Sequence, residues 1–300
     1  MAAGEQVDGR GVLLVFGSAV AWSFGGPIAR YLSVADSWTV VFWRSVAAAI
    51  FLLAVMLWRE GWQGTRKLFL AMGLPGLCVG LCFAIASSTF VMAMQYTTIA
   101  NILLMQAGVP LIAALVSFLV FRERVDGATW VAIAVVILGV AIMVSESLTG
   151  KVSPMGDGLS LLVALAFAGA TVITRRHAQV GMMPAVCTGT IIAALAAGSL
   201  MGSAVVSPGN AALLFVFGAL NLGLGMALFV RGVRLVPAAL AALIGVAEPV
   251  LGPLWVWLVH GEVPNARTLL GGAVVFLALL GHLGWQFQQQ RQSPAMPMPD

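Results

Sequence analysis

The chain contains 300 residues, of which 61% are hydrophobic and 9% charged, whereas roughly 25% of the residues in a typical soluble domain are charged. This composition excludes an ordinary soluble domain, because most of the resulting surface cannot face water. The formal net charge is +4, but the basic residues separate apolar runs instead of clustering with aromatic residues, which argues against nucleic-acid binding. We therefore expect an all-α integral membrane protein surrounded by lipid.

Apolar runs divide the chain into membrane-spanning lengths. A span needs about 20 mostly apolar residues to cross roughly 30 Å of hydrocarbon. Two stretches without Asp, Glu, Lys or Arg, 68–121 and 177–230, are each long enough for two helices joined by a polar turn. Along the whole chain this reasoning predicts ten transmembrane helices, at residues 11–31, 37–58, 69–95, 98–121, 127–146, 157–175, 184–205, 210–231, 237–260 and 266–287.

The two halves of the chain are related. Three residue pairs share one sequence separation: Pro110 with Pro249, Glu123 with Glu262, and Thr129 with Thr268. An odd number of helices in each repeat reverses the direction of the second, so we predict two inverted five-helix repeats at 11–146 and 157–287. This plan is typical of secondary transporters, whose solute site lies near the membrane midplane. Residues 288–300 are rich in Gln and Pro, and we expect a disordered cytoplasmic tail there.

Basic residues predict the orientation. Eleven of the 15 Lys and Arg residues fall at span ends on the side of the N-terminus and three on the other side, and Arg44 lies within a span. This asymmetry predicts that both termini are cytoplasmic in a bacterial inner membrane. Because an internally duplicated chain completes its own central site, we expect a monomer.

Glu248 is the deepest carboxylate in the predicted spans, and it lies directly before Pro249. A charge at membrane depth usually faces a cavity or a partner, and a proline removes a backbone donor and loosens the helix. Two interpretations stay open: Glu248 binds a substrate ammonium or carries a proton, or it is a buried glutamic acid bonded to a neighbouring helix. Pro110 occupies the equivalent position of the first repeat, and both prolines are candidates for gating.

Arg44 is the second deep charge, seven residues into the second predicted span. It is able to hold a substrate carboxylate or to pair with Glu248 or helix-end carbonyls. We favour a structural role that locks neighbouring spans together.

Uncharged polar and aromatic residues add further candidates at membrane depth. Hydrogen bonding between helices explains any single polar residue as well as substrate contact does, but their concentration on predicted spans one, three, four, six, eight and nine indicates a central cavity. The candidates for substrate binding are Trp22, Ser23, Ser88, Phe90, Asn101, Gln106, Thr171, Asn221, Glu248 and Trp255.

Several chemistries lack their sequence patterns. No GxxxxGK[ST] phosphate loop is present, so no ATP-driven pump is predicted. Cys78 and Cys82 share a helix face, yet no histidine lies near them in the sequence, and we predict neither a metal site nor a cofactor. An intramembrane enzyme, a scaffold and a channel are distant alternatives.

The chain resembles the ten-span EamA-type exporters of the drug/metabolite transporter superfamily. The resemblance covers residues 11–287 and rests on Trp22-Ser23, on Arg44, and on two segments, ANILLMQAGVPLIAALVSFLVFRE and AALIGVAEPVLGPLWVWLVHGE, each with a central proline and a terminal glutamate. Trp22-Ser23 together with Arg30 is similar to the YddG-type aromatic amino-acid exporters.

This resemblance implies export of aromatic and other neutral amino acids by alternating access through a central apolar cavity. The alternative is export of other small metabolites or cationic drugs, coupled to protons through Glu248.

Overall fold

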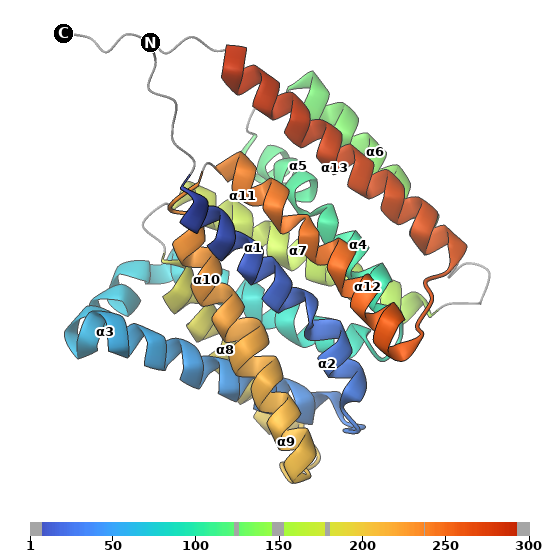
Figure 1. Cartoon of the computed structure of the whole chain (residues 1–300). Helices are drawn as coiled ribbons and strands as arrows, with labels where there is room; N and C mark the ends of the chain where they lie inside the picture. The colour runs from blue at the N-terminus through green and yellow to red at the C-terminus, as the bar shows by residue number, and fades with distance from the viewer. Residues whose placement is uncertain (1–7, 123–125, 146–152, 178–180, 237, 293–300) are drawn as a thin grey trace, which may run out of the picture.

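The computed structural model describes residues 8–122, 126–145, 153–177, 181–236 and 238–292. The described residues are helices joined by short connections (Figure 1). In chain order the helices are α1 (Gly9–Ser23), α2 (Gly25–Tyr31), α3 (Ser37–Ala93), α4 (Ile99–Ala107), α5 (Val109–Phe121), α6 (Gly127–Val144), α7 (Pro154–Arg176), α8 (Met182–Leu200), α9 (Pro208–Phe215), the π-helix η2 (Val216–Leu224), α10 (Gly225–Gly232), α11 (Ala238–Gly245), α12 (Ala247–His260) and α13 (Ala266–Gln292).

Helix α3 is two antiparallel spans. A straight helix of its 57 residues would be about 85 Å long, far more than a bilayer requires. Gly61 (φ 66°) and Gly73 (φ 53°) leave the helical conformation, and their positive φ values favour glycine. The helix therefore turns back on itself (Figure 1), and we call residues 37–60 its first arm and residues 74–93 its second arm.

Ten membrane spans result. Eight of the described helical segments, α3 among them, are long and apolar enough to cross a membrane, and α4 with α5 forms one more span bent by 50°. Counting the two arms of α3 separately gives the ten spans that the sequence predicts. Large apolar side chains such as Leu13, Ile50, Val131, Leu195 and Leu277 are exposed on the outside of the bundle, as a lipid-facing surface requires.

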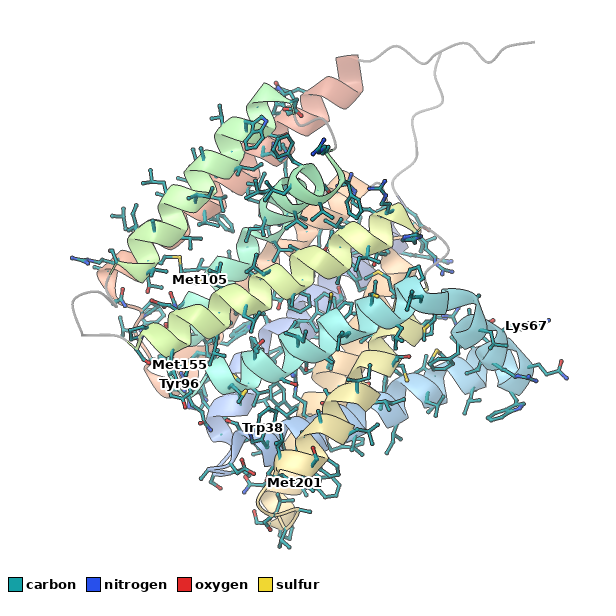
Figure 2. All side chains as sticks on the ribbon, turned by 180° about the vertical axis from the view of Figure 1, so that it is seen from behind. Trp38, Lys67, Tyr96, Met105, Met155 and Met201 are labelled. Atoms are coloured by element: carbon teal, nitrogen blue, oxygen red, sulfur yellow. The ribbon has the colours of Figure 1, made fainter. Side chains whose placement is uncertain are left out.

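The bundle has two ends, which we name the near end, where α1 begins at Gly9, and the far end, where α2 finishes at Tyr31. The turn between the two arms of α3 lies at the near end, and the connection from α3 to α4 lies at the far end. Figure 2 separates Lys67 at the near end from Tyr96 and Met155 at the far end. Short connections of this kind force consecutive spans to run in opposite directions.

The inverted repeat is visible in the backbone of the fourth span of each half. The break between α4 and α5 lies at Gly108, just before Pro110, and the break between α11 and α12 lies at Val246, just before Pro249. Proline lacks an N–H and clashes with the carbonyl four residues earlier, which explains both breaks. Both spans also end in a left-handed residue, Arg122 (φ 54°) and Gly261 (φ 67°).

Packing between helices follows the same repeat. Helix α1, in the first span of the first repeat, packs on α10, in the third span of the second repeat. In the same way α7, the first span of the second repeat, packs on the second arm of α3, the third span of the first repeat. Helices α6 and α13, the last spans of the two repeats, lie side by side along one edge (Figures 1 and 2). Their backbones meet at two glycines: a Cβ atom on Gly139 would lie 2.8 Å from the carbonyl oxygen of Gly271. Small residues permit such close approach.

One prediction about the C-terminus needs correction. Helix α13 continues to Gln292, so disorder does not begin at residue 288. Residues 293–300 lie outside the described part of the chain.

Candidate functional site: a central cavity

A cavity of about 370 Å³ lies in the middle of the bundle. Helices of both repeats contribute to its wall, including α1, both arms of α3, α4, α7, α10 and α12. The wall reaches Met182, the first residue of α8 at the near end. Three further spans also contribute: span two through Arg44, span seven through Met182, Val186 and Thr190, and span ten through Leu279. The prediction that spans one, three, four, six, eight and nine form the cavity was therefore incomplete.

Aromatic rings make up much of the wall. Trp22 and Phe229 pack against each other with ring centroids 5.3 Å apart, and Phe83 and Phe167 meet edge to face at 5.5 Å. Phe90 completes this set of cavity-lining aromatic residues. The indole Nε1 of Trp22 is buried and has no hydrogen-bond partner among the described residues. The wall therefore offers flat apolar surfaces, whereas the Trp22 Nε1 atom packs against Gly225 of α10.

Glu248 lines the cavity where the ninth span is broken. It is the second residue of α12, directly after the break at Val246, and the first turn of a helix is a favourable place for a negative charge. Within the described residues it makes no hydrogen bond and no ion pair. The proline pair, Pro110 and Pro249, also lines the cavity, so both interrupted helices open onto it.

Arg44 also lines the cavity, and only 6% of its surface is exposed. Its Nη1 donates to the Ser87 hydroxyl at 2.8 Å. The guanidinium carbon lies 4.2 Å from the centroid of the Phe217 ring and 5.8 Å from that of Phe90. Phe217 belongs to η2, a wide helical turn of a kind that often occurs at functional sites.

Three uncharged polar candidates face the cavity. The amide of Gln106 lies at the end of α4, and the Thr171 hydroxyl donates to the Phe167 carbonyl at 2.8 Å. The Asn221 side chain on η2 donates to the carbonyls of Ala21 and Trp22, at 2.7 and 3.0 Å. Asn221 thereby ties the first span to the eighth, and its Oδ1 atom makes no hydrogen bond with any described residue.

Four predicted substrate-binding residues do not line the cavity. Trp255 stacks on Phe24 at 5.4 Å and donates its Nε1 to the Ser23 hydroxyl at 3.1 Å, so these side chains join α12 to the first span. Asn101 is buried and donates to Asp157 at 2.7 Å. Ser88 is one position beyond Ser87, and successive helical residues point about 100° apart, which directs Ser88 elsewhere.

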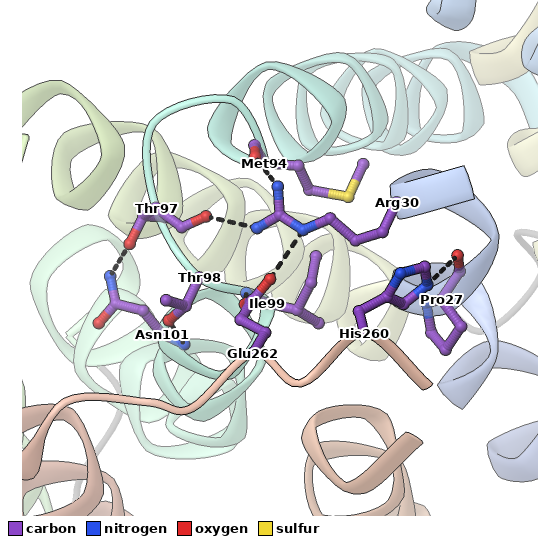
Figure 3. A network of polar contacts seen from close by, with 9 residues as sticks. All are labelled: Pro27, Arg30, Met94, Thr97, Thr98, Ile99, Asn101, His260 and Glu262. Atoms are coloured by element: carbon purple, nitrogen blue, oxygen red, sulfur yellow. Dashed lines mark hydrogen bonds and ion pairs between the residues drawn. The ribbon is translucent and has the colours of Figure 1, made fainter. Parts of the chain in front are cut away.

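A polar network closes the far end of the bundle, and we call it the far-end network (Figure 3). Arg30 at the end of α2 donates to Glu262 at 2.8 Å, to the Met94 carbonyl at 2.8 Å and to the Thr97 carbonyl at 3.1 Å. The second carboxylate oxygen of Glu262 accepts the backbone N–H of Ile99 at 2.9 Å. These contacts join spans one, three, four and nine.

Glu262 does not cap the helix that follows it in the chain. Glu262 caps α4, whereas Asn265 accepts the Thr268 N–H and caps α13. Glu123, its counterpart in the first repeat, lies outside the described residues. No residue of the far-end network lines the cavity, whose wall extends to the near end. The far-end network therefore lies outside the cavity wall, and we predict that it closes the cavity toward the far end.

Sequence reasoning missed several residues of the wall. Phe83, Phe167, Phe229, Met226 and Thr190 all line the cavity. Trp22 and Phe167 lie in the first helix of their respective repeats, and aligning the aromatic residues of these two helices would have drawn attention to Phe167. Thr190 is an uncharged polar residue inside predicted span seven, the same signal that selected Thr171. Phe83, Phe229 and Met226 carry no signal that separates them from lipid-facing residues of the same type.

A ten-span bundle of two inverted repeats around a central cavity defines a multi-pass membrane transporter. Comparison of the sequence with known protein families identifies the family of transporters. The model of the EamA-like transporter family matches residues 9–145 and 154–283. The chain therefore belongs to the EamA-like transporter family, which implies a small-molecule substrate and a lipid environment.

Individual relatives are distant. The chain is 27% identical over 246 residues to the pseudopaline exporter CntI of Pseudomonas aeruginosa, covering 80% of this chain and 84% of that protein. It is 25% identical over 208 residues to the uncharacterized transporter YwfM of Bacillus subtilis, covering 67% and 70%. One crystal structure, described only as that of a protein, has a TM-score of 0.61 at 18% identity, covers 94% of this chain and 99% of its own, and supports the fold alone.

Proposed function

We propose that the protein exports aromatic and other neutral amino acids across the bacterial inner membrane by alternating access. The observation that carries this proposal is the aromatic wall of a cavity that also holds a few hydrogen-bonding groups. Burying an aromatic ring gains roughly 25 cal/mol for each Å² of apolar area, and an unmatched buried polar group costs on the order of 1–3 kcal/mol. An amphipathic zwitterion with an apolar side chain suits such a cavity, whereas a sugar leaves its hydroxyls unpaired.

The two ends of the bundle support export as the direction of transport. The basic residues favour a cytoplasmic near end with both termini inside, so the cavity described here accepts solute from the cytoplasm while the far-end network is closed. The units that move relative to each other would be the repeats at 11–146 and 157–287, with the breaks before Pro110 and Pro249 as hinges. One chain supplies both halves of the cavity, which supports action as a monomer.

A second candidate is export of a cationic metabolite or drug with Glu248 as its binding site or proton carrier. The Glu248 carboxylate lines the cavity and bonds to no residue that the structure describes, which supports this candidate. The relative named as a pseudopaline exporter supports export as a direction and widens the range of solutes to be tested.

The test is saturable flux in liposomes that contain the purified protein. Efflux of Phe should depend on the protein and saturate with Phe concentration. Efflux that rises linearly without limit would indicate a channel, and efflux no faster than from protein-free liposomes would leave an enzyme or scaffold as the better account. Quaternary ammonium compounds in a parallel assay separate the second candidate from the first.

A further inference from the structure

Arg44 carries a positive charge in the wall of the cavity without a counter-ion. No carboxylate among the described residues lies within the 4.0 Å ion-pair distance of its guanidinium. Within the described part of the chain, its only hydrogen bonds are those that Nη1 donates to Ser87, at 2.8 Å to the hydroxyl and 3.5 Å to the carbonyl. Its Nε atom is buried and has no partner among the described residues. Glu248, the carboxylate of the same cavity, is not bonded to it.

An arginine in this position needs an anion. Its guanidinium stays protonated in proteins, and a buried charge without a partner costs several kcal/mol. The Phe217 ring at 4.2 Å offsets part of that cost through a cation–π contact. An arginine that only locked helices together would direct its donors at helix carbonyls or a carboxylate. Arg44 lines the cavity and reaches one helix carbonyl, that of Ser87, only at 3.5 Å, and among the described residues neither Nε nor Nη2 makes a hydrogen bond.

The surroundings also fix the direction of the guanidinium. Ser87 on the second arm of α3 holds Nη1, and Phe217 on η2 lies against the guanidinium plane. The backbone of η2 is in contact with the first arm at Gly218 and the Arg44 carbonyl. The N–H groups of the guanidinium, which form a planar fork of donors, are therefore held in place before a ligand arrives, and this reduces the entropy cost of binding.

We infer that Arg44 binds the carboxylate of the transported solute. This inference rests on the proposed function and deepens it, because it requires a carboxylate on the solute in addition to an aromatic or apolar side chain. Guanidinium and carboxylate match as planar forks. The cavity should then select amino acids over the corresponding amines and amides, with the solute's ring against the aromatic wall.

The experiment compares three ligands that share one ring. Purified protein in liposomes preloaded with Phe takes up radiolabelled Phe in the presence of Phe, phenylalanine amide or 3-phenylpropionate. The amide lacks the carboxylate, and 3-phenylpropionate lacks the ammonium group. The variants are Arg44→Gln, Arg44→Lys and, as a matched control, Arg66→Gln, which removes an exposed arginine near the turn between the arms of α3.

The wild type should require roughly tenfold more phenylalanine amide than Phe for half-maximal competition. Arg44→Gln should remove that difference, Arg44→Lys should restore part of it because the charge remains without the fork, and Arg66→Gln should retain all of it. A wild type that does not distinguish Phe from its amide, or an Arg44→Gln variant that still does, would overturn the inference. The wild-type comparison decides even where Arg44→Gln does not fold.

A binding measurement separates this inference from the proposed function. 3-Phenylpropionate should raise the unfolding temperature of the purified wild type and of Arg66→Gln, and should not raise that of Arg44→Gln. If Phe is not transported but this pattern holds, amino-acid export is wrong and the carboxylate site stands. If 3-phenylpropionate stabilises none of the proteins, or all of them equally, the carboxylate site is wrong.

Discussion

Arg30 and Glu262 join the far ends of the first and ninth spans through an Nε–Oε2 contact of 2.8 Å, although 232 residues separate them in the chain. The pair is partly exposed to solvent, with 30% of the Arg30 side chain and 19% of the Glu262 side chain exposed. Such a pair contributes little to stability by itself. Arg30 also binds the carbonyls of Met94 and Thr97 after α3, and Glu262 also binds the N–H of Ile99 at the start of α4. This position makes the ion pair a closure that solvent and a change of conformation can open.

Glu262→Gln should weaken that closure, because the amide keeps the shape but replaces the charge-assisted hydrogen bond to Arg30 with a neutral one. A cysteine at Leu103 on the cavity wall, with the three native cysteines replaced by alanine, reports access from the far side. Labelling by a membrane-impermeant thiol reagent should rise several-fold in Glu262→Gln. Glu60→Gln, an exposed glutamate at the near end, is the matched control and should leave labelling unchanged. Equal labelling in the two variants would show that the far-end network does not close the cavity.

Glu248→Gln distinguishes the roles open to the cavity carboxylate. If Glu248 binds an ammonium group or carries a proton, transport should fall by roughly tenfold or lose its pH dependence, because the amide neither carries charge nor titrates. Initial rates of Phe efflux across a range of internal pH values measure both effects. An unchanged rate with an unchanged pH profile would leave Glu248 as a structural residue.

Trp255→Phe should separate helix packing from substrate contact. The phenyl ring can still stack on Phe24, but the hydrogen bond to Ser23 is lost, which should lower the free energy of unfolding by about 1 kcal/mol. The order in which amino acids compete for transport should stay the same. Unfolding of the detergent-solubilised protein and competition assays measure the two effects. Trp257→Phe, at a side chain 53% exposed, is the matched control for stability.

Phe90→Ala should have the opposite pattern to Trp255→Phe, because Phe90 lines the cavity. Removal of the ring takes away part of the aromatic wall, so competition by Phe and Trp should weaken more than competition by Leu. A change of ligand preference in Trp255→Phe, with none in Phe90→Ala, would mean that the cavity described here is not the substrate site.

The orientation is testable with single cysteines at the two ends of the bundle. Cysteines at Lys67 and Gly181 should react only with reagents that enter the cytoplasm, and a cysteine at Asn210 should react with impermeant reagents outside the inner membrane. Lys151, which lies outside the described residues, should behave as Asn210 does. Labelling of Lys67 and Asn210 from the same side would contradict the ten-span topology.

The sequence predicts the fold well because the constraint is strong. A bilayer permits only backbones that satisfy their own hydrogen bonds, so apolar length locates the spans, and the shared separation of Pro110 with Pro249 identifies the repeat. The structure adds the backbone counterpart: helix breaks just before both prolines and left-handed ends at Arg122 and Gly261.

The site is less predictable because membrane spans are apolar on every side. Without a polar face, nothing in the sequence distinguishes a cavity-facing position from a lipid-facing or packed one. Six of the ten predicted substrate-binding residues line the cavity, and Ser23, Ser88, Asn101 and Trp255 do not. Ser23 and Trp255 are polar at membrane depth because they bond to each other, a pairing between distant helices that only the fold reveals.

Counterflow in liposomes preloaded with unlabelled Phe tests the central claim most directly, because it requires one site that alternates between the two sides of the membrane. Radiolabelled Phe should accumulate transiently, and external Phe, Trp, Tyr, Met and Leu should compete with it far better than Asp, Lys or sugars. Strong competition by sugars or quaternary cations, with none by Phe or Met, would contradict amino-acid export.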